Sequence, residues 1–81
     1  MFTGIKMPVL SATDDKYTIL KIHYDVGDFV NKSDIFMDVE NNGAAMNVGF
    51  YFSGKLTEIC VSEGQTVRYN ALLGVVESDG E

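Results

Sequence analysis

"TILKIHYDVGDFVNKSDIFMDVENNG" (residues 18–43) recurs as "KLTEICVSEGQTVRYNALLGVVESDG" (residues 55–80), aligned without a gap at a shift of 37 residues. Two copies are too few for a solenoid, which needs about three or more repeats to bury a continuous core. The repeat therefore predicts a single domain over residues 1–81 whose halves are related by a pseudo-twofold axis. Identical residues at matching positions are Ile22 and Ile59, Gly27 and Gly64, Val30 and Val67, Val39 and Val76, Glu40 and Glu77, and Gly43 and Gly80.

Short segments rich in β-branched and aromatic residues make up each copy, with Gly, Asn or Asp between them about every 8 to 12 residues. No window keeps the apolar spacing of a helix for more than one turn. The class is therefore all-β. We expect strands near residues 4–10, 18–25, 28–31, 35–41, 44–49, 55–61, 65–68 and 72–77.

The strongest turn signal is Asn42-Gly43, within "DVENNGAAMNV" (residues 38–48). Both central positions of a type I′ hairpin turn need a positive φ, which Asn and Gly accept most easily. Asp79-Gly80 ends the second copy in the same way, but no strand follows it in this sequence. The sequence predicts one complete hairpin tip, made by Asn41, Asn42, Gly43 and Ala44.

Charge and hydropathy exclude two classes of partner. Six Lys and Arg against twelve Asp and Glu give a net charge of −6, which repels phosphate backbones and anionic membrane surfaces. The apolar run "ALLGVV" (residues 71–76) is far below the roughly 18 residues that span a bilayer. The opening "MFTGIKMPVL" lacks the pattern of a secretory signal. We therefore expect a cytoplasmic protein that binds neither nucleic acid nor membrane.

The reactive side chains are few. Cys60 and His23 are the single residues of their types, which excludes an internal disulfide and leaves too few soft ligands for a zinc site. Cys60 lies between Ile59 and Val61 in a predicted strand, without the base or helix N-terminus that activates a thiol. No Ser-His-Asp order or phosphate-binding glycine loop is present. We expect a domain that is not an enzyme and holds no metal.

Three segments resemble the biotinyl/lipoyl attachment domain family. "MPVLSATDD" (residues 7–15) is similar to the family's first strand and following loop, and "MPVLS" favours the lipoyl domains of 2-oxo acid dehydrogenase acyltransferases. "YDVGDFVNKSDIFMDVE" (residues 24–40) looks like its Gly-Asp turn, and "GKLTEICVSEGQTV" (residues 54–67) like the second-half counterpart. The resemblance implies a flattened eight-stranded barrel-sandwich hybrid of two four-stranded sheets. It also implies that Leu56, Ile59 and Val61 point inward, leaving Cys60 and His23 outward.

In that family the central hairpin tip carries a lysine, commonly as Asp-Lys-Ala in lipoyl and Met-Lys-Met in biotinyl domains, to which an enzyme joins lipoate or biotin. Counting from Val39-Glu40, this position falls on Gly43. Glycine has no side chain, so neither cofactor can be linked there. None of the chain's lysines lies within three residues of the tip: they are Lys6, Lys16, Lys21, Lys32 and Lys55.

Two interpretations remain. The first is a lipoyl-like domain without a modifiable lysine or cofactor, which acts as a protein-interaction or scaffolding module, with an acyltransferase or dehydrogenase component as the expected partner. The alternative is a lipoyl or biotinyl swinging-arm carrier whose attachment lysine has been replaced at Gly43, or whose cargo sits on another residue. A small-molecule-binding module is a third class, and no residue pattern marks its pocket.

Two places are candidate partner contacts. Asp14 and Asp15 belong to the loop that, in lipoyl domains, lies beside the tip and helps partner enzymes recognise the domain; a plain solvated loop is the alternative. In "GFYFSG" (residues 49–54), strand alternation sends Phe50 and Phe52 to one side and Tyr51 to the other. An exposed Phe50 or Tyr51 would be a contact for a partner. The alternative puts Phe52 in the core, with Phe50 and Tyr51 over a sheet edge.

Overall fold

The computed structural model describes residues 1–8 and 16–78. Within these ranges every regular element is a strand, so the all-β prediction is confirmed, and no helix there is long and apolar enough to cross a bilayer. The eight strands of the described ranges are β1 (Phe2–Lys6), β2 (Lys16–Ile22), β3 (Phe29–Val30), β4 (Ile35–Asn41), β5 (Ala44–Gly49), β6 (Gly54–Ile59), β7 (Thr66–Arg68) and β8 (Leu72–Glu77).

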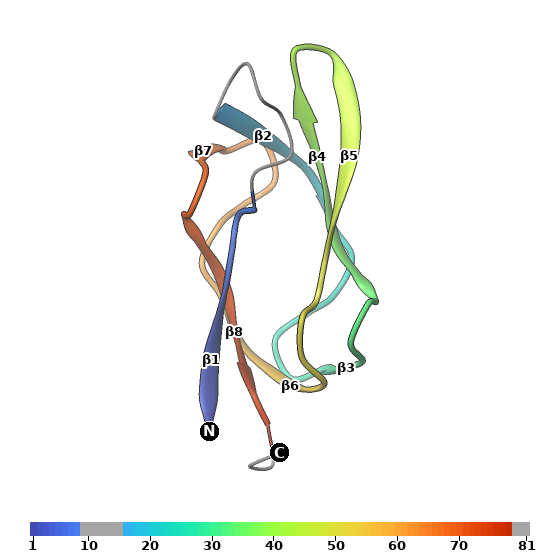
Figure 1. The fold of residues 1–81 in the computed structure, drawn as a ribbon, viewed down its shortest axis with the longest axis vertical. Coiled ribbons are helices and arrows are strands. Elements are labelled where there is room, and N and C mark those ends of the chain that lie inside the picture. Colours follow the sequence, from blue (N-terminus) through green and yellow to red (C-terminus); the bar gives the residue numbers. More distant parts are fainter. Residues whose placement is uncertain (9–15, 79–81) are drawn as a thin grey trace.

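The strands form two four-stranded sheets, which confirms the expected barrel-sandwich architecture (Figure 1). One sheet has the order β1-β8-β6-β3 and the other β5-β4-β2-β7, with antiparallel neighbours throughout. The molecule is elongated and flattened, with extents of 37 × 20 × 17 Å. The β4-β5 hairpin lies at one end of the long axis, and β3 and the start of β6 lie toward the other (Figure 1).

The pseudo-twofold axis predicted from the repeat is visible in the pairing. Moving each strand by one repeat turns β2, β3 and β4 into β6, β7 and β8, and so converts one sheet order into the other. The β2-β4 pair has a bulge between Ile19 and Lys21, and the β6-β8 pair has one at the equivalent place, between Leu56 and Glu58. Bulges at matching places show that the two halves share backbone irregularities as well as strand order.

The glycine turns interlock the two halves. Gly27 and Gly64 have φ values of 100° and 89°, as their positions in the repeat predict. The Gly27 N–H donates to the carbonyl of Leu56, and the Gly64 N–H donates to that of Ile19, both at 2.7 Å. Because each half's turn binds a strand of the other half, the core closes only when both halves are folded.

Strand bounds agree with the sequence prediction for β4, β5 and β8, whereas β1, β2, β3, β6 and β7 differ at their ends. The prediction extended β2 to residue 25, but the strand ends at Ile22. The Asp28 carboxylate accepts a hydrogen bond from the Asp25 N–H at 2.8 Å, which turns the chain before β3. The first strand begins at Phe2 and ends at Lys6, and residues 9 and 10 of its predicted range lie outside the described part.

Apolar side chains from both sheets meet between them in one core cluster. Near its middle the ring of Phe36 stacks on that of Phe50, with centroids 4.5 Å apart, and Tyr24 packs edge-on against Phe50 at 5.4 Å. The largest fully buried side chains are Tyr17, Phe36, Ile5, Met7, Ile19, Met37, Leu56 and Leu73.

The prediction of Phe50 as an exposed partner contact is wrong, because this side chain is only 2% exposed. β5 ends at Gly49, but the Phe50 N–H still donates to the Asp34 carbonyl at 2.9 Å, which holds the ring over the core. The chain then bends, so strand alternation does not continue. Tyr51 and Phe52 are both exposed, at 45% and 44%, and the alternative with Phe52 in the core is wrong as well.

Candidate functional site

The hairpin between β4 and β5 has the predicted tip. Asn42 and Gly43 have φ values of 52° and 83°, the two positive angles of a type I′ turn, and Asn41 pairs with Ala44 below them. The turn is exposed and lies at one end of the long axis (Figure 1). The positive angles follow from local chemistry, which is why the sequence alone predicts this turn.

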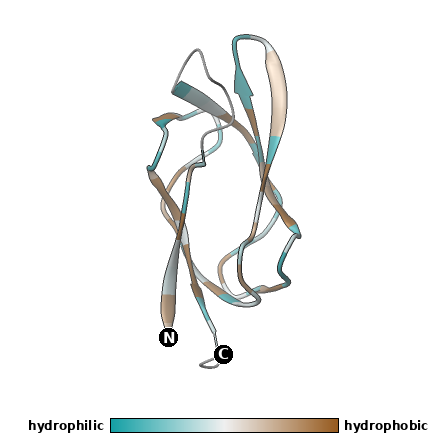
Figure 2. Cartoon of the chain, viewed as in Figure 1, coloured by the Kyte–Doolittle hydropathy of each residue, from teal (hydrophilic) through white to brown (hydrophobic). Residues whose placement is uncertain are grey.

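Asn41 anchors the base of the tip. Its side chain is buried, at 6% exposure, and its Nδ2 donates to the carbonyl of Lys16 at 2.8 Å, which joins β4 to the start of β2. Asn42 extends the network by donating from Nδ2 to the Asn41 Oδ1 at 3.4 Å. The end of β4 is coloured as hydrophilic in Figure 2. The tip is therefore a polar turn anchored at its base, and its amide side chains and glycine carry neither a nucleophile nor an amine.

The space around Gly43 is open. A Cβ atom placed there would meet nothing within 4 Å, so a side chain would project into solvent. Its cost would be the backbone conformation, because a left-handed φ costs a residue with a Cβ roughly 1–2 kcal/mol. The fold has room at this position for a side chain that the sequence does not supply.

Lys16 is closer to the tip than its place in the sequence suggests. It begins β2, is exposed, and its carbonyl holds the Asn41 side chain at the base of the tip. Counting along the chain missed this neighbour, because β2 and β4 are brought together only by their antiparallel pairing. Asp14 and Asp15 lie outside the described residues, so their position beside the tip stays a prediction.

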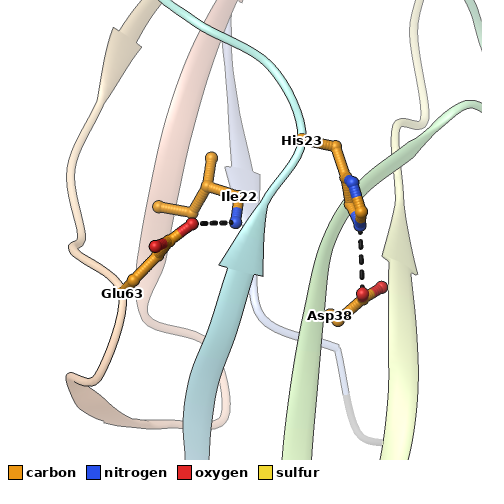
Figure 3. A network of polar contacts seen from close by, with 4 residues as sticks. All are labelled: Ile22, His23, Asp38 and Glu63. Carbon is orange, nitrogen blue, oxygen red and sulfur yellow. Dashed lines mark hydrogen bonds and ion pairs between the residues drawn. The ribbon is translucent and has the colours of Figure 1, made fainter.

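A second polar cluster lies on the side of the barrel (Figure 3). His23 Nε2 is 3.1 Å from Asp38 Oδ2, and both side chains are 34% exposed. On the neighbouring strand residue, the Ile22 N–H donates to the Glu63 Oε2 at 2.9 Å. These contacts fasten the end of β2 to β4 and to the turn before β7. His23 is thus a partly solvated histidine whose partner is a carboxylate of the same sheet.

Tyr24 follows His23 in the chain and contacts both a carboxylate and an aromatic ring of the protein. Its hydroxyl donates to Asp34 Oδ2 at 3.1 Å, and this hydrogen bond is the main reason that the pKa of Tyr24 is raised. A raised pKa keeps the phenol protonated, so it serves as a hydrogen-bond donor. Together with His23, Ile35, Asp38 and Asn47 it lines a shallow depression. Three of the polar side chains at this depression are engaged in contacts within the protein: His23 with Asp38, and Tyr24 with Asp34.

Cys60 is exposed, as predicted, whereas Leu56 and Val61 are buried and Ile59 is partly buried against the core. Desolvation raises the pKa of the thiol, and the Glu58 carboxylate raises it further. Since the thiolate is the nucleophile, both effects lower the reactivity of Cys60. Over residues 1–8 and 16–78, no group of three or more His, Cys, Asp or Glu is arranged to hold a metal ion.

The biotin/lipoyl family model, described as "Biotin-requiring enzyme", matches residues 3–76. The chain belongs to the biotin/lipoyl family. This membership confirms the resemblance found in the sequence motifs. It also agrees with a fold made of two similar halves. The hairpin tip, in the middle of the chain, is the candidate functional site of this biotin/lipoyl domain.

Two relatives are components of dehydrogenase complexes. The dihydrolipoyllysine-residue succinyltransferase component of the 2-oxoglutarate dehydrogenase complex of Bartonella vinsonii subsp. berkhoffii is 35% identical over 78 residues, 96% of this chain and 19% of that protein. The dihydrolipoyllysine-residue acetyltransferase component of the pyruvate dehydrogenase complex of Rhizobium meliloti (strain 1021) is 33% identical over 79 residues, 96% and 18% of the two chains. The domain spans about a fifth of the length of these relatives.

A solved structure supports the same assignment. The solution structure of the lipoyl domain of the 2-oxoglutarate dehydrogenase complex from Azotobacter vinelandii superposes with a TM-score of 0.75 at 28% identity. The match covers 95% of this chain and 98% of that domain. The fold is that of a lipoyl domain.

Proposed function

We propose that this biotin/lipoyl domain carries no cofactor at its hairpin tip and works as a non-catalytic protein-interaction or scaffolding module. The observation that carries the proposal is Gly43 at the exposed outer position of a type I′ turn, where the family's attachment lysine is expected. Lipoate and biotin are attached as amides, which require an amine. The relatives belong to dehydrogenase complexes, which supports an acyltransferase or dehydrogenase component as the partner.

The geometry of the turn favours a domain without a cofactor over a carrier domain with a lysine at the tip. Asn42 and Gly43 are the residue types that fit the two positive φ angles with the least strain. A lysine at position 43 would add roughly 1–2 kcal/mol of backbone strain. The sequence at the tip is suited to a stable turn, and the core and cross-half hydrogen bonds of the fold are intact around it.

One observation favours the alternative, a swinging-arm carrier whose attachment lysine has been replaced at Gly43. The space around the Cβ position of Gly43 is open, so the fold could accept a projecting side chain there. Lys16 is the residue to inspect for an unconventional attachment, since its backbone contacts Asn41 at the base of the tip.

The experiment is an intact-mass measurement after co-expression with a lipoate ligase and, separately, with a biotin ligase. We expect the mass of the unmodified chain in both cases, because no lysine projects from the turn. A gain of lipoate or biotin would contradict the proposal. Peptide mapping would then locate the group, and its loss in Lys16→Arg would assign it to Lys16.

Gly43→Lys is the matched control, together with an authentic lipoyl domain as a positive control for the ligase. Modification of Gly43→Lys would show that the surroundings of the tip are still recognised and that Gly43 alone prevents attachment. If the authentic domain is modified and Gly43→Lys is not, the surroundings have diverged as well. This variant therefore distinguishes the loss of the attachment residue alone from a divergence of the whole tip.

A further inference from the structure

A groove is lined by residues of β3, of the start of β6 and of the end of β8. β3 and the start of β6 lie toward the end of the molecule away from the hairpin tip (Figure 1). The groove has a volume of about 850 Å³ and lies beside the β3 edge of one sheet. We call it the aromatic groove and define it by the side chains that the following argument uses: Phe29, Lys32, Tyr51, Phe52, Lys55 and Glu77.

Three aromatic rings line the groove and remain open to solvent. Phe29 is 66% exposed, Tyr51 45% and Phe52 44%. Aromatic side chains clustered on a small surface supply much of the energy of protein contacts, because each covers a large apolar area with little loss of conformational entropy. Phe50, by contrast, is needed in the core. Tyr51 and Phe52 do not belong to the core cluster.

Hydrogen bonds from two backbone N–H groups, one to a side-chain hydroxyl and one to a carbonyl, hold the wall that presents these rings. The turn at residues 31–34 is joined to the bend at residues 50–53. The Lys32 N–H donates to Ser53 Oγ, and the Ser33 N–H donates to the Phe50 carbonyl, both at 2.9 Å. A surface that is ordered before binding loses less entropy on binding. The hydrogen bonds thus preorganise this wall of the groove for binding.

The charge of the groove differs from that of the rest of the molecule. Among the lining residues in the described part of the chain, Lys32 and Lys55 stand against one carboxylate, Glu77. The whole chain, by contrast, has twelve acidic and six basic residues. Phe29 pairs with Lys55 across β3 and β6, and Lys55 pairs with Glu77 across β6 and β8. Lys55 therefore stands between an aromatic side chain and a carboxylate on the adjacent strands. An acidic segment would be repelled by most of the surface and attracted here.

We propose that the aromatic groove binds an acidic peptide segment of a partner protein, whose apolar side chains cover Phe29, Tyr51 and Phe52 and whose carboxylates meet Lys32 and Lys55. This inference rests on the proposed function as an interaction module and names its docking surface and the chemistry of its partner. Because β3 and the start of β6 lie toward the end of the molecule away from the hairpin tip (Figure 1), a segment bound there leaves the tip uncovered. Attachment at the tip and binding in the groove are therefore independently testable.

The test is selection of short random peptides displayed on phage against the wild-type domain and against Tyr51→Ala/Phe52→Ala. We expect peptides that combine Asp or Glu with Phe, Leu or Ile to be enriched on the wild type only. For a synthetic peptide of the enriched sequence, fluorescence anisotropy should show affinity at least about tenfold lower for the double variant and for Lys55→Glu. Binding should also weaken when salt is raised to about 0.5 M.

Matched controls are Tyr69→Ala, which removes an aromatic side chain that is 52% exposed outside the groove, and Lys6→Glu, which reverses an exposed charge outside it. Both should keep wild-type affinity. Thermal melts should show that all variants remain folded, because exposed substitutions change stability by about 0.5 kcal/mol or less.

Three results would overturn the inference. If peptides enrich equally on Tyr51→Ala/Phe52→Ala, or if the enriched peptides are basic, the groove is not the binding site for acidic peptides. The interaction surface of the domain would then lie elsewhere. No enrichment on either protein would remove peptide binding from the proposed function altogether. A wild-type dimer in sedimentation equilibrium that the double variant converts to a monomer would assign the groove to a second copy of this chain instead.

Discussion

Gly54→Ala is expected to lower the free energy of unfolding by about 4 kcal/mol. A Cβ atom on Gly54 would overlap the carbonyl oxygen of Glu77 and approach Val76 Cγ1 to 2.8 Å. Its φ of 157° also lies in a region that residues with a Cβ rarely adopt. A domain of this size has a total stability of about 4–12 kcal/mol, so this one methyl group removes a large share of it.

Urea denaturation followed by circular dichroism measures this loss, and Gly27→Ala is the matched control. Gly27 has a positive φ of 100°, but a Cβ atom there would meet nothing within 4 Å. Its substitution should lower the free energy of unfolding by only about 1–2 kcal/mol, which is the cost of the backbone conformation alone. Equal losses in the two variants would show that the contact with the end of β8 is not what requires glycine at position 54.

Phe36→Ala is expected to cost about 3–5 kcal/mol, the range for removing a fully buried aromatic side chain. Phe36 is 0% exposed and its ring stacks on Phe50, which in turn packs against Tyr24. The remaining cavity would lie between the two sheets, where strand pairing limits how far the backbone can close it. The melting temperature should fall by more than about 10 °C, as read by differential scanning calorimetry.

Phe52→Ala is the control for this prediction, since it deletes the same ring at a side chain that is 44% exposed. Its stability should stay within about 0.5 kcal/mol of the wild type. A loss as large as that of Phe36→Ala would mean that Phe52 packs in the core, as the sequence alternative proposed. The pair of variants therefore also tests the orientation of the aromatic run.

Much of the fold could be predicted because its signals are local or repeated. The strands at residues 35–41, 44–49 and 72–77 stand between turn residues and have the predicted bounds. Gly27 and Gly64 mark turns with positive φ in both halves. The repeat predicts that the two halves have the same strands and turns. The β-bulges at matching places in the two halves agree with this prediction.

The prediction for Phe50 failed for a physical reason. Alternation of side chains holds only while the backbone remains extended, and the chain bends directly after this residue. Phe50 is buried against Phe36, and its N–H donates to the carbonyl of Asp34, a residue of the turn before β4. Pattern analysis of residues 49–54 contains no information about that acceptor.

The amino-acid sequence by itself determined the pseudo-twofold all-β fold and the type I′ tip at Asn42 and Gly43. The repeat can be read by aligning the chain with itself, and the positive φ angles depend on the residue types at the turn. Only the tertiary structure decided that Lys16 lies beside the base of the tip and that an aromatic groove forms beside β3 and the start of β6. Both arrangements join residues from separate strands and turns. Such contacts depend on how the two sheets pair and bend, which no single stretch of the chain encodes.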